Sequence, residues 1–273
     1  MGSSVGAAAK AGGSRVVWAS AGRSEATKAR AGADGLEDVG TLAELVEQSD
    51  IIISICPPSA AEGVARQVIA LKFKGIYVDA NAISPETARA IANLFQDAGA
   101  SFVDGGIIGP PARAQGSTRL YLSGEQAEPV AAFFAVSPLN AIALVGEIGK
   151  ASALKVAYAA WTKGTSALLL AVRAFARAEG VEQDLFQEWA LSQPELAKRT
   201  DSMIMRTPQK AWRFAGEMNE IASAFGSAGL PEGFHQAAEE IYARLEAFKG
   251  VAQAESEEVL AALSKPSQDT DID

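Results

Sequence analysis

The sequence predicts an α/β fold, in which a doubly wound sheet of mainly parallel strands is followed by an all-α domain. Two observations support this prediction. Short apolar runs alternate with helical segments between residues 15 and 145, which is typical of parallel strands joined by right-handed crossovers. From Lys150 onward the pattern is helical almost throughout. We therefore expect a sheet domain over residues 1–148, a helical domain over 149–250 and a solvated tail over 251–273.

The expected strands are apolar runs bounded by turn residues. The clearest is DIIISI at residues 50–55, because an unbroken run of β-branched residues is typical of a strand buried on both faces. Pro57-Pro58 ends this run. The other expected strands lie at residues 15–20, 75–80, 101–104, 119–123 and 141–145.

Helices are expected at residues 3–11, 25–33, 42–48, 60–71, 85–98 and 127–135, and then at 152–179, 183–191, 194–205, 209–225 and 233–248. A doubly wound sheet normally starts with a central strand and a glycine turn ahead of its first helix. This sequence opens on the helix, with Gly2 in its first turn. We therefore expect the central strand to be absent, through a misplaced coding start or a true truncation, unless MGSS is a cloning remnant.

Composition narrows the classes of partner. The net charge of −9 argues against a nucleic acid or an anionic membrane. The single cysteine, Cys56, excludes an internal disulfide and fits a reducing cytosol. No apolar run approaches the length of a membrane span, so we expect a cytoplasmic protein that binds a small molecule. His235 is the only histidine, which excludes a zinc site of the usual spacing.

The most informative stretch is GEIGKASALKVAYAAWTK at residues 146–163, where a glycine-spaced turn enters a helix rich in alanine and leucine. Lys155 has apolar neighbours on both sides, and helix geometry places Tyr158 on the same face. Partial desolvation weakens the preference of an ammonium for its charged form, which suits proton transfer near neutral pH. The alternative is a lysine whose stem lies along apolar surface while its amine reaches water.

The segment SAGRS at residues 20–24 indicates which cofactor is accepted. In a doubly wound sheet, a carboxylate at this point takes the ribose hydroxyls of NAD. Here no acid occurs before Glu25, whereas Arg23 and the hydroxyls of Ser20 and Ser24 offer donors to a 2′-phosphate. NADP is therefore favoured over NAD. The alternative is a solvated turn in which Ser24 is the N-cap of the next helix.

Further candidates follow the ends of the expected strands. Cys56, Pro57, Pro58 and Asn81 come directly after two consecutive strands, where ligands bind in open α/β sheets. Turn chemistry explains the same residues without a ligand. DGGIIGPP at residues 104–111 is expected to be a loop, which could present N–H groups to a substrate carboxylate or could simply be a tight connection.

These segments, in this order, resemble the β-hydroxyacid dehydrogenase and 6-phosphogluconate dehydrogenase superfamily over nearly the whole chain, in particular its branch with a C-terminal domain of unknown function. Met1-Gly2 resembles the end of the family's GxGxxMG fingerprint. FVDGGIIGPP at residues 102–111 is similar to the family's substrate loop, D-A-P-V-S-G-G. GEIGKASALK at residues 146–155 is similar to the family's G-x-x-G-x-G-x-x-x-K, with Lys155 at the catalytic lysine.

The resemblance implies a Rossmann-type NADP-binding domain and a homodimer in which the long helix forms an interface. It also implies that Lys155 donates or accepts a proton at the substrate oxygen, with Tyr158 as its neighbour. Gly2 joins the cofactor residues named above. The residues expected to line the substrate are Gly105, Gly106, Ile108, Gly109 and Trp161, with Trp212 and Arg213 as further candidates from the helical domain.

Departures from the family weigh against 6-phosphogluconate as the substrate. Tyr158 and Ala159 stand where members carry an asparagine, and Thr162 stands where the decarboxylating enzymes carry a glutamate. The sequence therefore favours an NADP-dependent oxidoreductase that acts on a small hydroxyacid. Two alternatives stay open: an imine reductase on the same fold, and a truncated relative that binds a partner without catalysis.

Overall fold

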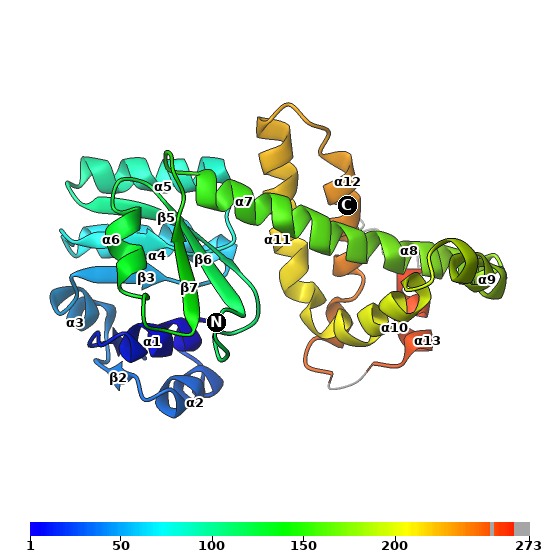
Figure 1. The fold of residues 1–273 in the computed structure, drawn as a ribbon, viewed down its shortest axis with the longest axis horizontal. Coiled ribbons are helices and arrows are strands. Elements are labelled where there is room, and N and C mark those ends of the chain that lie inside the picture. The colour runs from blue at the N-terminus through cyan, green and yellow to red at the C-terminus, as the bar shows by residue number, and fades with distance from the viewer. Residues whose placement is uncertain (252–253, 265–273) are drawn as a thin grey trace, which may run out of the picture. The chain divides into compact units, whose positions relative to one another are not determined.

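The computed structural model describes residues 1–251 and 254–264, and the chain divides into two compact units (Figure 1). The boundary falls between Val156 and Ala157, whereas the sequence placed it between residues 148 and 149. The difference arises because the boundary lies inside a helix, α7 (Lys150–Ala159). A boundary within a helix leaves no linker composition for sequence analysis to detect.

In the first unit, the described residues form two sheets. β1 (Val17–Trp18) pairs in parallel with β2 (Glu37–Asp38). A five-stranded sheet has the order β3-β4-β5-β6-β7, with bounds Ile51–Ser54, Ile76–Asp79, Ser101–Ile108, Thr118–Ser123 and Leu139–Ala143. Within the described part of the chain, no strand pairs with the second edge of β1 or of β3. A doubly wound sheet without its central strand gives this division into two sheets.

Helices pack against the five-stranded sheet and form two hydrophobic cores with it (Figure 1). α1 (Gly2–Ala11) and α6 (Ala127–Ala132) contribute to one core, together with Leu120 of β6. α4 (Ala61–Ala70) and α5 (Pro85–Asp97) contribute to the other, where Tyr77 stacks on Phe95 with ring centroids 4.3 Å apart. The unit also contains α2 (Glu25–Ala33), α3 (Leu42–Glu47) and a 3-10 turn at Pro58–Ala60.

β5 corrects the expectation of a loop over residues 104–111. The strand continues to Ile108, and its second half pairs antiparallel with β6, with Gly106 opposite Tyr121. The loop begins only at Gly109. Because the connection over residues 109–117 contains no helix to form a parallel crossover, the next strand runs back beside β5. The sheet is therefore mixed rather than wholly parallel.

The second unit is all-α over its described residues. Its α-helices are α8 (Thr165–Ala178), α9 (Glu182–Ser192), α10 (Leu196–Arg206), α11 (Pro208–Ser227), α12 (Gly233–Ala243) and α13 (Ser256–Leu263), with a 3-10 turn at Glu246–Phe248. The continuous helix expected over residues 152–179 is interrupted by a π-helical turn, Ala160–Gly164. At this turn, the Tyr242 hydroxyl donates to the Lys163 carbonyl oxygen at 2.7 Å. A side chain from α12 therefore provides a hydrogen-bond donor to one backbone carbonyl of the π-helical turn.

α13 corrects the expectation of a solvated tail from residue 251. Val259, Leu260 and Leu263 are buried, and α13 packs on α8 and α10. Its apolar residues therefore belong to the core of the second unit. The remainder of the expected tail, residues 252–253 and 265–273, lies outside the described residues.

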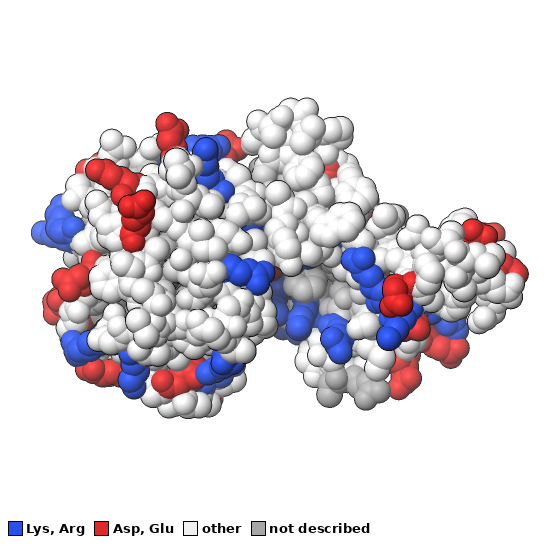
Figure 2. Space-filling model, viewed as in Figure 1, with Lys and Arg blue, Asp and Glu red and all other residues white. Residues whose placement is uncertain are grey.

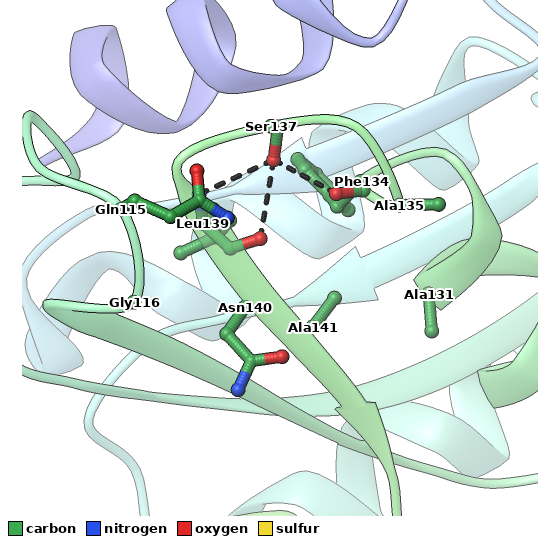
Figure 3. Close-up of a pocket in the computed structure, with 9 residues that line it drawn as sticks. All are labelled: Gln115, Gly116, Ala131, Phe134, Ala135, Ser137, Leu139, Asn140 and Ala141. Carbon is green, nitrogen blue, oxygen red and sulfur yellow. Dashed lines mark hydrogen bonds between the residues drawn. The ribbon is translucent and has the colours of Figure 1, made fainter.

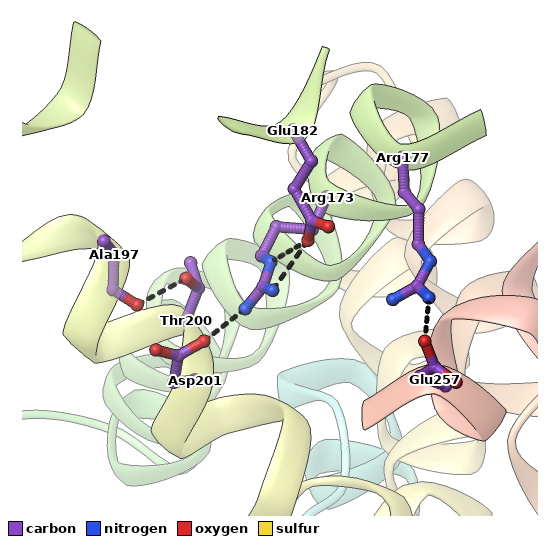
Figure 4. A network of polar contacts seen from close by, with 7 residues as sticks. All are labelled: Arg173, Arg177, Glu182, Ala197, Thr200, Asp201 and Glu257. Atoms are coloured by element: carbon purple, nitrogen blue, oxygen red, sulfur yellow. Dashed lines mark hydrogen bonds and ion pairs between the residues drawn. The ribbon is translucent and has the colours of Figure 1, made fainter. Parts of the chain in front are cut away.

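A network centred on Arg173 joins three helices of the second unit (Figure 4). The guanidinium of Arg173, on α8, donates to Glu182 Oε1 on α9 at 2.7 and 3.1 Å and to Asp201 Oδ1 on α10 at 2.5 Å. The Arg173 side chain is 7% exposed, whereas Arg177, which pairs with Glu257, is 39% exposed. Since only the first pair is largely withdrawn from water, Arg173 contributes more to the fold than Arg177.

Candidate functional site

Asn81 holds the carboxyl ends of β3 and β4 together. Its side-chain oxygen accepts from the backbone N–H of Cys56 at 2.5 Å, and its side-chain nitrogen donates to Ser54 Oγ at 3.2 Å. Its own backbone N–H donates to Asp79 Oδ1 at 3.0 Å. Cys56, the first residue of the CPP turn, and Asn81 therefore lie side by side.

Beneath this edge lies a cluster of buried polar groups. Tyr77 Oη and Asp79 Oδ2 are both buried and have no hydrogen-bond partner. Burial, with a smaller contribution from the charge of Asp104, raises the pKa of Asp79 to about 7. Burial also raises the pKa of the Cys56 thiol, which is therefore not a thiolate nucleophile at neutral pH.

The loop after β1 lies against a carboxylate that sequence analysis missed. Asp38, at the end of β2, accepts from the backbone N–H groups of Ser20 at 3.2 Å and Gly40 at 2.9 Å. Hydrogen bonding with the Ser20 side chain is the main cause that lowers the pKa of Asp38. The available signal was the position of Asp38 at the end of a neighbouring strand. Ser20 therefore interacts with an acid.

Arg23 and Ser24 occupy the rest of this loop. Ser24 is the N-cap of α2, where its Oγ accepts from the Thr27 N–H at 3.4 Å. Arg23 is exposed, and its charge lowers the pKa of the Cys56 thiol against the larger effect of burial. The guanidinium therefore lies within electrostatic range of the end of β3.

Two adjacent glycines in β5 allow close approaches, Gly105 to the end of β4 and Gly106 to α7, which bears Lys155. A Cβ on Gly105 would lie 2.9 Å from the Asp79 carbonyl oxygen. A Cβ on Gly106 would lie 2.7 Å from the Ala151 carbonyl oxygen and 3.0 Å from Lys155 Cβ. No larger residue fits either position without a shift of backbone. Lys155 is half-buried in α7 against this part of β5, one strand away from Asp79.

The positions of the other residues of the GGIIG segment are explained by the fold alone. Ile108, expected at the substrate, ends β5 and is buried. Gly109 has a φ of +125°, and a Cβ there would lie 2.5 Å from the Ser117 carbonyl oxygen. Gly109 therefore makes the turn out of β5 possible. Asp104, which matches the family's substrate loop, is a fully buried side chain in mid-strand.

The remaining candidates belong to the second unit. Tyr158 and Trp161 are exposed. The Lys249 amine lies 4.2 Å from the centre of the Trp212 ring. His235 is buried between the rings of Phe225 and Phe234, and burial lowers its pKa. A neutral imidazole in this position packs as an aromatic side chain.

A shallow pocket of about 220 Å³ lies elsewhere, beside β7 (Figure 3). Its polar lining includes Gln115, Asn140 and Ser137, whose hydroxyl donates to the carbonyl oxygens of Phe134 and Leu139 at 2.9 and 3.1 Å. No residue in its lining is titratable. The pocket therefore offers no acid or base, and none of the predicted site residues borders it.

The described residues contain no group of three histidine, cysteine, aspartate or glutamate side chains arranged to bind a metal ion. No described helix is long and apolar enough to cross a membrane. Figure 2 shows lysine, arginine, aspartate and glutamate scattered together over the visible face of the first unit. Charges of both signs are therefore interspersed on that face.

Comparison with known families gives two matches. Residues 1–139, just over half of the 273-residue chain, match the NAD binding domain of 6-phosphogluconate dehydrogenase. Residues 176–245 match a domain of unknown function, DUF1932. The chain belongs to the β-hydroxyacid dehydrogenase superfamily. The first unit is therefore the NAD(P)-binding domain of this superfamily, and the second unit contains the DUF1932 domain.

Individual proteins are similar to this chain in sequence or in fold. An uncharacterized 28.5 kDa protein from Methanothermus fervidus is 34% identical over 168 residues, which cover 61% of this chain and 63% of that protein. Conserved protein MTH1747, of unknown function and structurally similar to 3-hydroxyacid dehydrogenases, is 28% identical over 90% of this chain and 93% of its own, with a TM-score of 0.66. Mycobacterium tuberculosis 3-hydroxyisobutyrate dehydrogenase, solved with L-serine, shares the fold at 17% identity, with a TM-score of 0.68 over 97% and 96% of the two chains.

The residues of this superfamily member fit a bound dinucleotide. The N-cap residue Met1 makes no side-chain capping bond to the first turn of α1, which begins at Gly2, and the N–H groups of a helix start suit a pyrophosphate. Arg23 supplies a positive charge near the end of β3. Asn81 fixes the backbone of Cys56, and therefore the start of the CPP turn, at the same edge. These three features come from separate segments that the fold places around the carboxyl ends of β1, β3 and β4.

Asp79→Asn is expected to stabilise the first unit more at pH 8 than at pH 4.5. In the unfolded chain this carboxyl ionises near pH 4, whereas burial raises its folded pKa to about 7. The folded state therefore retains a proton that the unfolded state releases, and stability falls as pH rises from about 4 to about 7. The measurement is the melting temperature of variant and wild type at both pH values, with the exposed Asp97→Asn as control. An equal difference at both pH values would exclude this assignment.

Proposed function

We propose that this protein is an NADP-dependent oxidoreductase that transfers a hydride between nicotinamide and a small hydroxyacid or its carbonyl counterpart. The observation that supports this most is the position of Lys155. Its helix is packed on Gly106, and the neighbouring Gly105 is packed on the end of β4, beside the edge that fits a dinucleotide. A half-buried amine at this place suits proton transfer at a substrate oxygen.

In this proposal the chain's own residues bind, orient and exchange a proton. Bound NADP would accept or supply the hydride at its nicotinamide ring. Lys155 accepts the hydroxyl proton during oxidation and returns one to the oxygen during reduction. Tyr158, three residues further along α7, is the proposed neighbour of this proton transfer. The backbone of Gly105 and Gly106 forms the floor of the proposed substrate site, because neither residue has a side chain.

Lys155→Met is expected to lower kcat about 10²- to 10⁴-fold, the usual contribution of one general acid or base. NADPH binding should stay within about twofold of wild type, because the proposed cofactor residues lie on other elements. Lys150→Met, which removes an exposed amine from the same helix, serves as the matched control. Turnover would be followed at 340 nm with a panel of 3-hydroxyacids and, in the reductive direction, cyclic imines.

Two outcomes would contradict the proposal. Wild-type protein that fails to bind NADPH in a fluorescence titration would exclude an oxidoreductase and favour a non-catalytic role. Activity of Lys155→Met equal to that of Lys150→Met would exclude the amine as the proton-transfer group. Turnover of imines alone would retain the fold and cofactor but replace the substrate class.

For the cofactor, Arg23→Ala is expected to weaken NADPH binding about tenfold and to leave NADH binding nearly unchanged. The reason is that a guanidinium matches a 2′-phosphate, and a hydrogen bond to a charged group contributes about 1.5 kcal/mol. Ser20 and Ser24 are its proposed companions, although Ser20 also interacts with Asp38. The test compares dissociation constants for both cofactors. A preference for NADH in wild type would overturn the NADP assignment.

We also propose that the long helix forms a homodimer interface. Three large apolar side chains, seven residues apart, are strongly exposed on the π-helical turn and α8: Trp161 (64%), Leu168 (48%) and Phe175 (66%). A spacing of seven residues places Leu168 and Phe175 on nearly the same side of the helix. Exposed apolar stripes of this kind mark protein contacts.

The double variant Leu168→Glu/Phe175→Glu is expected to convert a dimer into a monomer, because two charges in an apolar interface would be desolvated without partners. Leu191→Glu, which charges an exposed apolar residue on α9, is the control and should remain dimeric. Light scattering coupled to size exclusion measures the mass. A wild-type mass of one chain, or a double variant that remains dimeric, would exclude this interface.

A further inference from the structure

The carboxylate of Asp104 is the buried anchor of the helix that bears Lys155. Its Oδ2 accepts from Ser123 Oγ at 2.9 Å, from the Gly149 N–H at 2.9 Å and from the Ser152 N–H at 3.0 Å. Its Oδ1 accepts from Ser152 Oγ at 2.5 Å. Two of these four donors are backbone N–H groups at the start of α7. Asp104 therefore caps this helix from a neighbouring strand.

Ser123 adds a second connection from β6 to the same turn. Its Oγ donates to Asp104 and accepts from the Ala151 N–H at 3.1 Å. The segments β5, β6 and α7 thus share one hydrogen-bond network. The first N–H groups of a helix lack partners within the helix, and a carboxylate also complements the helix dipole. The start of α7 is therefore fixed in position along its axis.

Gly106 fixes the same helix laterally. It follows Asp104 by two residues on β5, and its missing side chain lets the Ala151 carbonyl and Lys155 Cβ approach the strand. The carboxylate and the glycine together define where Lys155 lies relative to β5. A displacement of about 1 Å in a catalytic group can cost about 10²-fold in rate. A contact that fixes the position of α7 would therefore affect the rate of proton transfer at Lys155.

We propose that Asp104 is a positioning residue, which acts on the reaction by holding α7 so that the Lys155 amine meets the substrate oxygen. This inference rests on the proposed function of Lys155 and extends it to a residue that does not itself touch the substrate. Ser123 and Ser152 are its partners in this role. Removal of the carboxylate shifts the helix start and with it the amine.

Asp104→Ala is expected to lower kcat about 10²-fold while the KM and the dissociation constant for NADPH stay within about threefold. Asp104→Asn is the conservative variant and should retain at least a tenth of the wild-type kcat, because its amide oxygen still accepts from the helix and its nitrogen can donate to Ser152 Oγ. In Asp104→Asn/Ser152→Ala that acceptor is gone, but the amide oxygen still accepts from the Gly149 and Ser152 N–H groups, so kcat should fall between the values of Asp104→Asn and Asp104→Ala. Asp97→Ala, at an exposed carboxylate, is the control.

A second measurement does not depend on turnover. Lys155 would be acetylated in brief pulses and its labelling rate compared by mass spectrometry with that of exposed Lys150 in the same helix. In Asp104→Ala, the ratio of the labelling rate of Lys155 to that of Lys150 should rise about fivefold, because the half-buried amine is no longer held in place and becomes more accessible to the reagent. The double variant replaces Asp104→Ala if Asp104→Ala does not fold.

The outcomes separate this inference from the proposed function. Wild-type protein without turnover removes the reaction, yet a changed labelling ratio still shows that Asp104 positions Lys155. An unchanged ratio together with an unchanged kcat in the folded variants overturns the inference. An equal loss in Asp104→Asn and Asp104→Ala, accompanied by weaker NADPH binding, also overturns it, because such a loss reflects general damage to the fold.

Discussion

A buried negative charge at the start of α7 is the constraint on which the candidate site depends. The Asp104 side chain has no exposure to water, so its carboxylate requires donors from the protein. The helix supplies two backbone N–H groups and one hydroxyl, and β6 supplies another hydroxyl. The carboxylate of Asp104 and the N–H groups at the start of α7 are each other's hydrogen-bond partners. These bonds therefore fix the position of α7 relative to β5.

The same edge of the sheet contains a second buried carboxyl group, which has different hydrogen-bond partners. Asp79 lies opposite Asp104 in the parallel pairing of β4 and β5, but it has far fewer donors, and one of its oxygens has no partner. Burial and the neighbouring charge therefore raise its pKa to about 7. The two side chains show how differently two adjacent buried carboxyl groups can be supplied with hydrogen-bond donors.

The second unit is held by interactions of its own. Arg173 connects α8 to α9 and α10 from a largely buried position, and the apolar face of α13 completes the core (Figure 4). The π-helical turn at Ala160–Gly164 is fitted to α12, since a Cβ on Gly164 would lie 3.0 Å from the Phe234 ring. A regular helix would place the following residues of α8 on a different face.

The sequence by itself determined the order of the elements, the apolar runs that form the parallel strands and the placement of Lys155 on a helix after a glycine turn. These features follow from local periodicity and from residue types that restrict the backbone. The tertiary structure decided the length of β5, its antiparallel partner, the burial of α13 and the proximity of Asp38 to Ser20. Each depends on contacts between distant segments; Asp104 and Ser152, for example, are 48 residues apart. Such contacts leave no periodic signal in either segment, so only the folded chain reveals them.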